Sequence, residues 1–521
     1  MKLDYKYNNF YEIIEQNSKQ NGKKTILYSE NGNLTNNQLK DKIDTFADFL
    51  IHSGIKKDDK VAMVMENSEY FIISLFAITK IGAVAVPINN FLKNEELEYI
   101  LNNSNVKILI TSDNFKEQFK GIEKTTQIEK TVWVRSDITP DNINFCFDDI
   151  LTNHIFKTTN IQYPSLDDIA VIVYTSGTTG HPKGAMLSHK NILSNCISGS
   201  IRFDIVPKDR FIVYLPMFHS FTLSIMIMLP LYNNCSVVIV KSIFPFANVL
   251  KQVLLKRVTI FLGAPQIYNA LNKAKIPWYF MWFNCIRGFV SGSAPLSEQV
   301  LIDFKNKFKK ATVMEGYGLS ECSPAVAINP FEKQKSLSVG IPLPSYEVKI
   351  VDEELLELKT NEVGELIVKG DCVMQGYYNN EEATNSTIVN GWLKTGDLGK
   401  KDEDGYIYVV DRKKDLIISK GVNIYPREIE ELIYKLDDVD ASAVVGIEDE
   451  TKDEKIVAFI QLKEDLKTDI NEKDVKKYLK EHLANFKVPK HIYFIDELPK
   501  NATNKVLKRK LKEDIDLYIN K

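Results

Sequence analysis

The chain has 521 residues and a formal net charge of −3, from 66 basic and 69 acidic side chains, and 44% of its residues are hydrophobic. This length exceeds one ordinary compact domain, so we expect at least two domains, each with enough apolar residues for a core. The near balance of charge argues against a dedicated nucleic-acid-binding protein, which usually carries a clear basic excess. The six cysteines form no CxxC pair, which argues against a zinc site or a disulfide framework and favours reduced thiols in a cytosolic protein.

The N-terminal segment MKLDYKYNNFYEII lacks an uninterrupted apolar core, so we expect no signal peptide. The longest apolar stretches are residues 70–87, interrupted by Lys80, and residues 221–232, interrupted by Pro230. Neither is a clean apolar span of about 20 residues, so no transmembrane helix is predicted. We therefore expect a cytoplasmic protein, and peripheral contact with the inner face of a membrane stays open.

Short apolar runs alternate with longer segments of helical spacing through the first 400 residues, which predicts an α/β fold with mostly parallel, covered sheets. The apolar residues Tyr70, Ile73, Leu75 and Phe76 mark one expected helix. Residues 347–370 instead have the pattern of paired strands around polar turns, so an antiparallel portion is expected after the α/β part. The predicted buried strands are residues 61–65, 106–111, 169–175, 235–240 and 259–263.

A domain boundary is predicted at the charged run DRKKD of residues 411–415, which follows a turn at residues 402–405 and an alternating strand. The predicted domains are residues 1–411 and a small α+β domain, residues 412–521, of about 110 residues, which is an ordinary domain size. Its expected elements are a helix that begins near Pro426 and buries Ile429, Leu432, Ile433 and Leu436, strands at 443–447, 456–462 and 492–495, and a helix capped by Asn471 with Val475, Tyr478, Leu479 and His482 on one face.

Residues 174–184 read YTSGTTGHPKG and follow a predicted strand. Glycines let the backbone approach a phosphate closely, and hydroxyls, backbone N–H groups and the charge of Lys183 suit its oxygens. A Walker loop requires Gly–Lys–Ser/Thr, whereas here Pro182 precedes Lys183 and Gly184 follows it, so this class of phosphate loop is excluded. An ordinary turn rich in Gly and Thr is the alternative.

Five later motifs accompany this loop, and together they resemble the adenylate-forming (acyl-activating, AMP-binding) superfamily. The resemblance covers essentially the whole chain, and LPMFHSF at 215–221 and MQGYY at 374–378 are most similar to bacterial fatty-acyl-CoA synthetases, the long-chain fatty acid–CoA ligases. The five motifs are GSAPL at 292–296, EGYGLSE at 315–321, GWLKTGDL at 391–398, DRKKDLIISKGVNIYPREIE at 411–430 and PKNATNKVLKR at 499–509.

The resemblance implies a large AMP-binding and acyl-pocket domain whose antiparallel portion is barrel-like, followed by a mobile small domain. It implies an ATP-dependent ligase that adenylates a fatty acid and transfers the acyl group to coenzyme A, with ATP, Mg²⁺ and coenzyme A as cofactor and co-substrates. An acyl carrier protein as acceptor and an aromatic acid as substrate remain alternatives of the same fold. A non-catalytic acyl or nucleotide sensor is the alternative of another class, and a homodimer stays open.

The resemblance also implies the nucleotide site. Tyr317 is expected to stack on adenine, and Asp397 to accept hydrogen bonds from the ribose hydroxyls, a task suited to an acceptor-only carboxylate. Glu321 and Thr175 are expected at the Mg²⁺, since carboxylate oxygens suit a hard cation. The whole expected set for ATP and AMP is Thr175, Ser176, Gly177, Thr178, Thr179, Gly180, Lys183, Gly292, Ser293, Ala294, Glu315, Gly316, Tyr317, Gly318, Ser320, Asp397 and Arg412.

Lys505 and His219 are the expected catalytic residues. By resemblance, Lys505 bridges the substrate carboxylate and the α-phosphate, although Asn504 stands where the family usually has Gly. His219 is expected beside the passage between the acyl pocket and the thiol tunnel, with a packed core histidine as an equal alternative. Lys414 is expected at the hinge and Gly421 along the coenzyme A tunnel.

The acyl pocket is expected to be apolar. Residues 217–227 contain no acidic side chain, which disfavours an amino acid as substrate. Trp278, Phe280, Trp282 and Phe283 add an aromatic segment. This segment fits an acyl pocket, ordinary packing or contact with a membrane, and the sequence does not separate these three.

Overall fold

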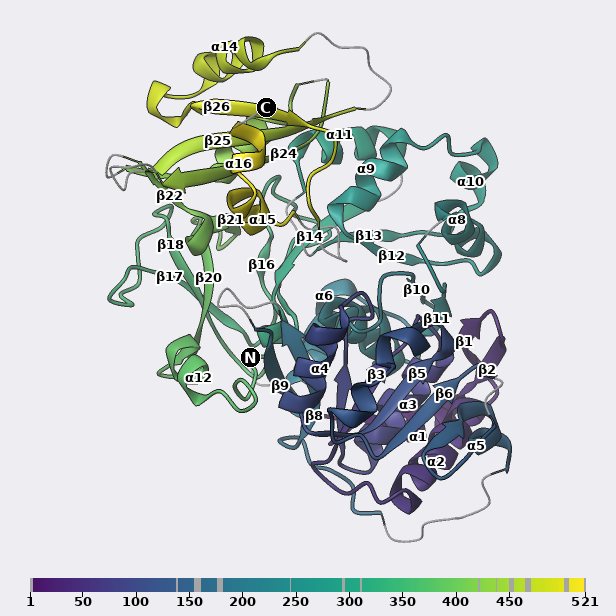
Figure 1. Ribbon diagram of the computed structural model, residues 1–521. Helices are drawn as coiled ribbons and strands as arrows, with labels where there is room; N and C mark the ends of the chain where they lie inside the picture. Colours follow the sequence, from purple (N-terminus) through teal and green to yellow (C-terminus); the bar gives the residue numbers. More distant parts are fainter. Residues whose placement is uncertain are drawn as a thin grey trace.

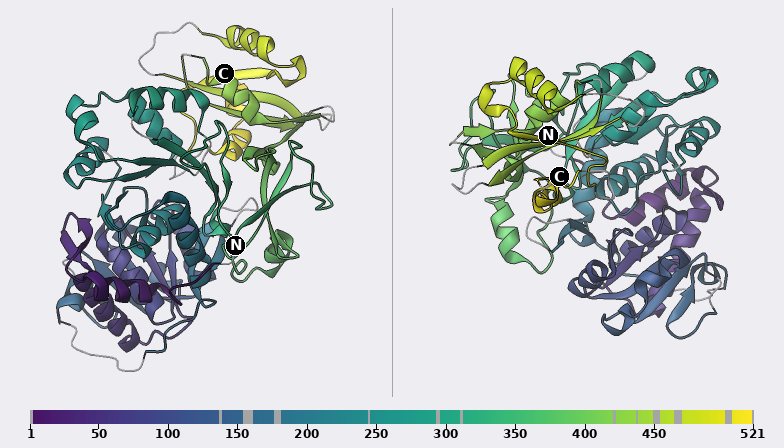
Figure 2. Two further views of the ribbon diagram at one scale, coloured as in Figure 1. Left: turned by 180° about the vertical axis from the view of Figure 1, so that it is seen from behind. Right: turned by 45° about the horizontal axis from the view of Figure 1, so that its top comes forward.

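The structure is a computed structural model with two large sheets, a five-stranded antiparallel sheet and a smaller C-terminal part (Figure 1). The C-terminal strands and the N-terminal helices lie at opposite ends of the molecule, as Figure 2 shows from two further sides. This architecture confirms the predicted α/β class with an antiparallel portion and a small α+β part. The described residues are 3–136, 139–153, 161–175, 181–243, 245–292, 296–309, 312–419, 422–436, 438–448, 454–463, 470–500 and 506–519.

The first large sheet has seven strands, and its strands run parallel except where the last one, β9, pairs with β8. The predicted strands at 61–65, 106–111 and 169–175 correspond to β3, β5 and β8. In spatial order the strands are β7 (Asn144–Cys146), β6 (Lys130–Val134), β5 (Val106–Ser112), β3 (Lys60–Val64), β4 (Val84–Pro87), β8 (Ile169–Thr175) and β9 (Lys183–Ser188).

The second large sheet has nine strands, and the six from β14 to β1 in spatial order are parallel. The predicted strands at 235–240 and 259–263 correspond to β11 and β12. In spatial order the strands are β16 (Ile341–Pro342), β15 (Ala325–Ile328), β14 (Thr312–Gly318), β13 (Gly288–Ser291), β12 (Ile260–Gly263), β10 (Arg210–Val213), β11 (Ser236–Ile239), β1 (Thr25–Ser29) and β2 (Gly32–Thr35).

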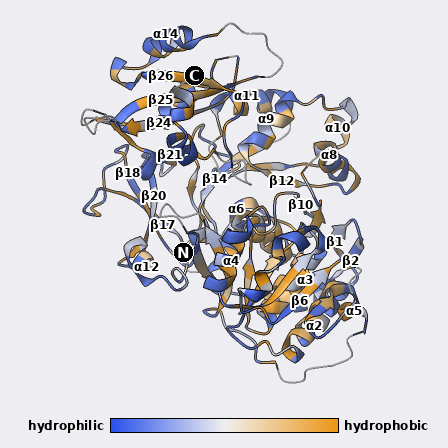
Figure 3. Ribbon diagram, in the orientation of Figure 1, coloured by the Kyte–Doolittle hydropathy of each residue, from blue (hydrophilic) through white to orange (hydrophobic). Residues whose placement is uncertain are grey.

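Helix α3 (Glu69–Lys80) is buried along its whole length, as expected for a helix that is apolar on every side. The apolar stretch at 70–87 is therefore core, and Figure 3 shows hydrophobic residues gathered on α3 and the strands around it. No helix in the described ranges is both long and apolar enough to span a membrane. The other helices up to the antiparallel sheet are α1 (Phe10–Asn21), α2 (Asn36–His52), α4 (Asn94–Asn103), α5 (Phe147–Asn153), α6 (His189–Phe203), α7 (Leu229–Tyr232), α8 (Phe246–Leu255), α9 (Pro265–Lys273), α10 (Trp278–Phe283) and α11 (Glu298–Lys307).

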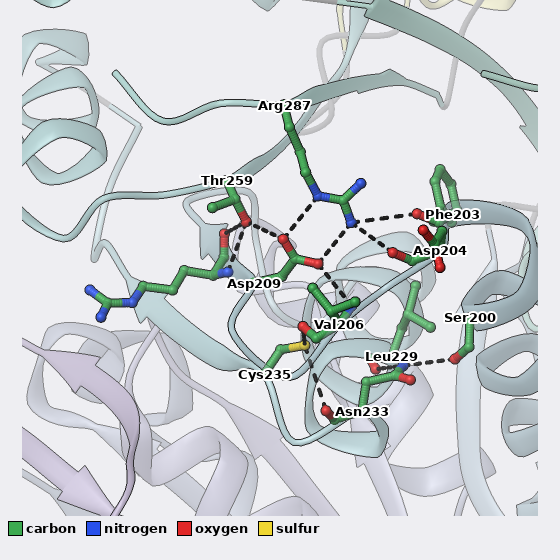
Figure 4. Close-up of polar contacts among 11 residues, drawn as sticks. Ser200, Phe203, Asp204, Val206, Asp209, Leu229, Asn233, Cys235, Thr259 and Arg287 are labelled. Carbon is green, nitrogen blue, oxygen red and sulfur yellow. Dashed lines mark hydrogen bonds and ion pairs between the residues drawn. The ribbon is translucent and has the colours of Figure 1, made fainter. Parts of the chain in front are cut away.

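An ion pair between the buried Asp209 and the half-buried Arg287 ties together three strands of the nine-stranded sheet (Figure 4). Arg287, just before β13, donates from Nε to Oδ1 of Asp209 at 2.9 Å and from Nη2 to Oδ2 at 2.7 Å. The hydroxyl of Thr259, just before β12, donates to Oδ1 of the same carboxylate at 2.8 Å. Burial alone would raise the pKa of Asp209, but these charge-assisted bonds lower it. They also fix the starts of β10, β12 and β13 relative to one another.

The predicted antiparallel portion is confirmed. Strand β18 pairs with β17 and β20, and β20 pairs with β19 and β21, all antiparallel. Because this sheet carries Asp397 and Arg412 on neighbouring strands, it forms one wall of the candidate site. Its elements are β17 (Glu347–Val351), β18 (Gly364–Lys369), α12 (Glu381–Thr387), β19 (Ile388–Val389), β20 (Trp392–Lys401) and β21 (Ile407–Arg412).

The C-terminal part has cores of its own, formed by residues from Ile417 onward. One sequence expectation needs correction there: helix α13 ends at Ile433, so Leu436 lies in the turn beyond it. His482 shares a helix face with Tyr478, as expected, and is exposed. The elements are β22 (Ile417–Ser419), β23 (Val422–Ile424), α13 (Pro426–Ile433), β24 (Val439–Glu448), β25 (Glu454–Leu462), α14 (Glu472–His482), β26 (His491–Ile495), α15 (Lys508–Glu513) and α16 (Asp516–Ile519).

Candidate active site

Three sheets supply the candidate site residues. Thr175 ends β8 and Lys183 begins β9, so these two residues of the seven-stranded sheet face each other as cross-strand partners. Tyr317 lies near the end of β14 in the nine-stranded sheet, and Asp397 and Arg412 are cross-strand partners in the antiparallel sheet. The contacts below join these groups across the sheets.

Glu321 follows β14 in a short 3-10 turn, and its carboxylate forms the first group of contacts in the site. Its Oε1 accepts a hydrogen bond from the hydroxyl of Tyr377 at 2.9 Å and lies 3.5 Å from Oγ1 of Thr175. The ammonium of Lys183 lies 5.4 Å from the centre of the Tyr377 ring. The structure therefore brings the three expected phosphate and metal residues together around Tyr377.

Tyr377 was not singled out from the sequence as a site residue. Its only signal was its place in MQGYY, which supported the family resemblance but carried no role. Burial and then the Glu321 carboxylate raise the pKa of Tyr377, so its phenol remains a proton donor to Glu321 at neutral pH.

The carboxylate of Asp397 forms the second group of contacts, and its side chain is almost completely buried. The hydroxyl of Tyr317 donates to its Oδ2 at 2.6 Å, and Nε of Arg412 lies 3.2 Å from its Oδ1. A carboxylate has about four acceptor positions, so two positions remain for further hydrogen bonds. The same phenol that holds Asp397 belongs to the ring expected to stack on adenine.

Of the two glycines that flank Tyr317, only Gly318 is required by the packing of the backbone. A Cβ at Gly318 would lie 2.1 Å from the carbonyl oxygen of Pro324, so this position accepts only glycine without movement of the chain. A Cβ at Gly316 would meet the Ala327 carbonyl oxygen at 3.5 Å, an ordinary contact. Gly318 therefore places β14 against the segment that follows Glu321.

Glu315 is buried and accepts a hydrogen bond from the backbone N–H of Leu296 at 3.2 Å. Burial raises the pKa of this carboxyl to about 7, and the Leu296 N–H and Arg427 oppose the rise. Since its oxygen holds the backbone at Leu296, Glu315 supports the site through the backbone.

The expected acyl region adjoins the nucleotide region. The hydroxyls of Ser220 and Ser320 are 2.8 Å apart, and a Cβ at Gly292 would lie 3.2 Å from the ring of Phe221. His219 is half-buried, and its Nδ1 accepts a hydrogen bond from the Phe221 N–H at 3.3 Å. A buried π-helix, Thr222–Met228, follows, an irregular geometry that the sequence did not predict and that is frequent at functional sites.

The remaining expected residues are divided between an exposed turn and segments that are not described. Lys414 is exposed in the 3-10 turn Lys413–Asp415. A backbone bridge between Lys500 and Val506 and a hydrogen bond from the Leu507 N–H to the Pro499 oxygen at 2.8 Å bring the two flanks of the catalytic-lysine motif together. The expected residues that lie outside the described part of the chain are Ser176, Gly177, Thr178, Thr179, Gly180, Ser293, Ala294, Gly421 and Lys505.

A buried charge cluster lies at the predicted domain boundary, and the sequence did not indicate it. The backbone N–H of Arg427 donates to Oδ2 of Asp411 at 2.9 Å, and Lys508 forms an ion pair with Glu430 at 2.8 Å. Burial raises the pKa of Asp411. Burial alone would lower the pKa of Lys508, but Glu430 and Asp411 raise it. This cluster attaches the start of α15, three residues after Lys505, to α13.

Comparison with known proteins identifies the family. The sequence pattern of the AMP-binding enzyme family matches residues 14–378, and that of the AMP-binding enzyme C-terminal domain matches residues 428–505. The chain therefore belongs to the AMP-binding enzyme family, as the motifs predicted.

Relatives and solved structures agree with this assignment. The long-chain-fatty-acid–CoA ligase of Bacillus subtilis (strain 168) is 36% identical, over 90% of this chain and 88% of that protein. The enzyme of the same name from Escherichia coli O6:H1 is 30% identical, over 98% of this chain and 95% of its own. The crystal structure of the anthranilate CoA ligase AuaEII in complex with anthranoyl-AMP matches with a TM-score of 0.91 at 27% identity, covering 99% of both chains.

Proposed function

We propose that this protein is an ATP-dependent ligase that joins an apolar carboxylic acid to AMP and transfers the acyl group to coenzyme A, releasing AMP and pyrophosphate. The observation that carries the proposal is that one short segment supplies both groups of contacts, in a chain of the AMP-binding enzyme family. Tyr317 holds Asp397, and four residues later Glu321 lies beside Thr175. Relatives named as CoA ligases support the same reaction class.

Mg²⁺ fits the groups around Glu321. The carboxylate of Glu321 and the hydroxyl of Thr175 are hard oxygen donors 3.5 Å apart. Among the described residues there is no cluster of three or more His, Cys, Asp or Glu side chains that could hold a metal. Mg²⁺ is commonly bound through one or two carboxylates together with waters and substrate phosphates, so Glu321 and Thr175 suffice. When bound, the ion would offset negative charge on the ATP polyphosphate.

In the first step, the substrate carboxylate attacks the α-phosphorus of ATP, and the bond to pyrophosphate breaks. Such a step depends mainly on positioning and charge neutralisation. Tyr317 and Asp397 hold adenine and ribose, Lys183 and the loop after Thr175 hold the polyphosphate, and Lys505 offsets charge on the reacting oxygens.

In the second step, a thiolate attacks the acyl carbonyl of the adenylate, and AMP leaves. His219 borders the passage by which the thiol arrives, and the Gly421 segment lines the tunnel. Lys414 is the hinge about which residues 412–521 reorient between the steps, a transition of the hinge type. These roles follow from the family motifs.

The acid is proposed to be a medium-chain or long-chain fatty acid. The support is the apolar, acid-free segment at 217–227, which includes the buried residues Met217, Ile225 and Met226, together with the names of the fatty-acid–CoA ligase relatives. An aromatic acid is the second candidate, favoured by the close match to the anthranilate CoA ligase structure.

The test measures pyrophosphate release with ATP, Mg²⁺ and acids from acetate to oleate and including benzoate and anthranilate, with and without coenzyme A. We expect release that depends on a fatty acid, appearance of a CoA thioester, and a loss of about a hundredfold or more in Lys505→Ala. Lys510→Ala, an exposed lysine on α15, is the matched control and should keep wild-type activity.

Each other outcome has a definite meaning. Adenylate formation without a thioester would indicate that the acyl acceptor is an acyl carrier protein. Selective use of benzoate or anthranilate would indicate that the substrate is an aromatic acid. ATP binding without pyrophosphate release from any acid would contradict the ligase proposal and favour the sensor.

A further inference from the structure

Helix α10 lies at the rim of the molecule, beside α8 (Figure 1), and carries exposed aromatic side chains. The exposed fractions are 71% for Trp278, 78% for Trp282 and 68% for Phe283. In contrast, Phe280 on the same helix is buried and Met281 packs on the core, so the helix is anchored while its other face is open. The sequence left an acyl pocket, ordinary packing and membrane contact open for this segment. Ordinary packing accounts only for Phe280 and Met281.

The chain around α10 has an unusual charge pattern. Residues 210–297 contain no Asp or Glu, although the protein as a whole is slightly acidic. The segment contains eight cations, namely Arg210, Lys241, Lys251, Lys256, Arg257, Lys273, Lys275 and Arg287.

Some of these cations are neutralised by acids from elsewhere in the chain. Arg287 pairs with Asp209, and Lys273 pairs with Asp440. Lys251, Arg257 and Lys275 are exposed, and none of the three has an ion pair within the described part of the protein. They lie on α8, just after α8 and just before α10, so these cations belong to chain segments that adjoin the aromatic helix (Figure 1).

We propose that α10, together with Lys251, Arg257 and Lys275, is a docking surface for an anionic lipid bilayer. Tryptophan and other aromatic side chains partition into the boundary between headgroups and acyl chains, and neighbouring cations are attracted to anionic headgroups. A second copy of this chain fits less well, because a symmetric contact would place these cations against like charges. The surface binds lipid whether or not the ligase reaction proceeds.

The experiment measures co-flotation of the full-length protein with vesicles of phosphatidylcholine alone and of phosphatidylcholine mixed with phosphatidylglycerol, without ATP or coenzyme A. Wild type should float with the anionic vesicles. The triple variant Trp278→Ser/Trp282→Ser/Phe283→Ser should partition about tenfold or more weakly. Quenching of tryptophan fluorescence by brominated lipid should be strong in wild type and weak in the variant, since the other tryptophans, Trp133 and Trp392, lie elsewhere in the fold.

The matched control is Leu356→Ser/Phe486→Ser/Leu517→Ser, which removes three exposed apolar side chains far from α10 in the sequence and should leave flotation unchanged. Lys251→Gln/Arg257→Gln/Lys275→Gln tests the charge, and each removed cation should weaken binding to anionic vesicles roughly fivefold at low salt.

Three outcomes would overturn the proposal. The first is equal flotation of wild type and the aromatic variant, and the second is no flotation of wild type. The third is a wild-type dimer in light scattering that becomes a monomer in the aromatic variant without any vesicle binding, which would assign α10 to a contact between copies.

Discussion

Tyr317 contributes two groups to the candidate site, the face of its aromatic ring and its hydroxyl. The ring is proposed to stack on adenine, and the phenol holds Asp397 by a 2.6 Å hydrogen bond. Tyr317→Phe keeps the ring and removes the bond to a charged acceptor, so we expect ATP binding to weaken about tenfold, measured by calorimetry. Tyr408→Phe removes a similar bond, 3.2 Å to Asp402, and is the control. Equal affinity of Tyr317→Phe and wild type would show that the phenol does not position Asp397 for the nucleotide.

Glu315 predicts a dependence of stability on pH. Its pKa is raised from 4.5 to about 7 by burial, so the folded state prefers the neutral acid. The stabilisation is complete below pH 4.5, decreases as the pH rises from there, and is lost above about pH 7. Glu315→Gln stays neutral and should be more stable than wild type by up to about 3 kcal/mol at pH 8 and equal to it near pH 4.5.

Urea unfolding at the two pH values measures this difference. Glu353→Gln, in an exposed turn, is the control and should match wild type at both pH values. A Glu315→Gln protein that is less stable than wild type at pH 8 would contradict the prediction.

At the scale of elements, Gly340 joins the two walls of the site. It precedes β16 in the nine-stranded sheet and forms a backbone bridge to Ile407 of β21 in the antiparallel sheet. Its φ is +88°, and a Cβ there would lie 2.0 Å from the Ile328 carbonyl group. Gly405 has nearly the same φ, +83°, but a Cβ there would meet no atom within 4 Å.

Alanine substitutions at the two glycines distinguish the cost of backbone strain, which both share, from the cost of a steric clash, which only Gly340 has. Gly405→Ala should cost only the strain of a left-handed residue, about 1–2 kcal/mol. Gly340→Ala should cost several kcal/mol more and lower activity, because β15 must move away and shift Tyr317 relative to Asp397. Thermal unfolding checks both variants, and an equal loss in the two would contradict this account.

Hydrophobic periodicity and capping residues predicted the ends of some helices and strands correctly and of others incorrectly. The predicted strand at 169–175 agrees with β8 at both ends, and Asn471 caps α14, as expected. The structure adds a capping box with Asp474. The stripe of Ile429, Leu432, Ile433 and Leu436 suggested a longer helix, but α13 stops at Ile433. Leu432 and Leu436 are partly buried and still pack on the same core, so the core contact was predicted correctly and the helix length was not.

At the scale of the whole molecule, the predicted boundary near residue 411 can be tested by dissection. The two C-terminal cores use only residues from Ile417 onward. We therefore expect a fragment of residues 412–521 to fold cooperatively on its own, giving dispersed amide signals in NMR and a sigmoidal urea transition.

A shorter fragment is the control. Residues 428–521 lack Ile417 and Ile424, which are both completely buried, so this fragment should remain unfolded or aggregate. If residues 412–521 are also unfolded, the boundary is wrong, and the contact of Arg427 with Asp411 belongs to the core of the small domain rather than to its attachment.

The sequence by itself determined the family, the α/β class and the approximate places of the strands, because these depend on local motifs and on hydrophobic periodicity. It also placed Thr175 and Lys183 in one loop, since they are eight positions apart. Only the tertiary structure decided that Tyr317 holds Asp397, that Tyr377 holds Glu321, and that Trp278 and Trp282 are exposed. Each of these facts depends on how separate elements pack, and no local pattern in the chain encodes a contact between different sheets.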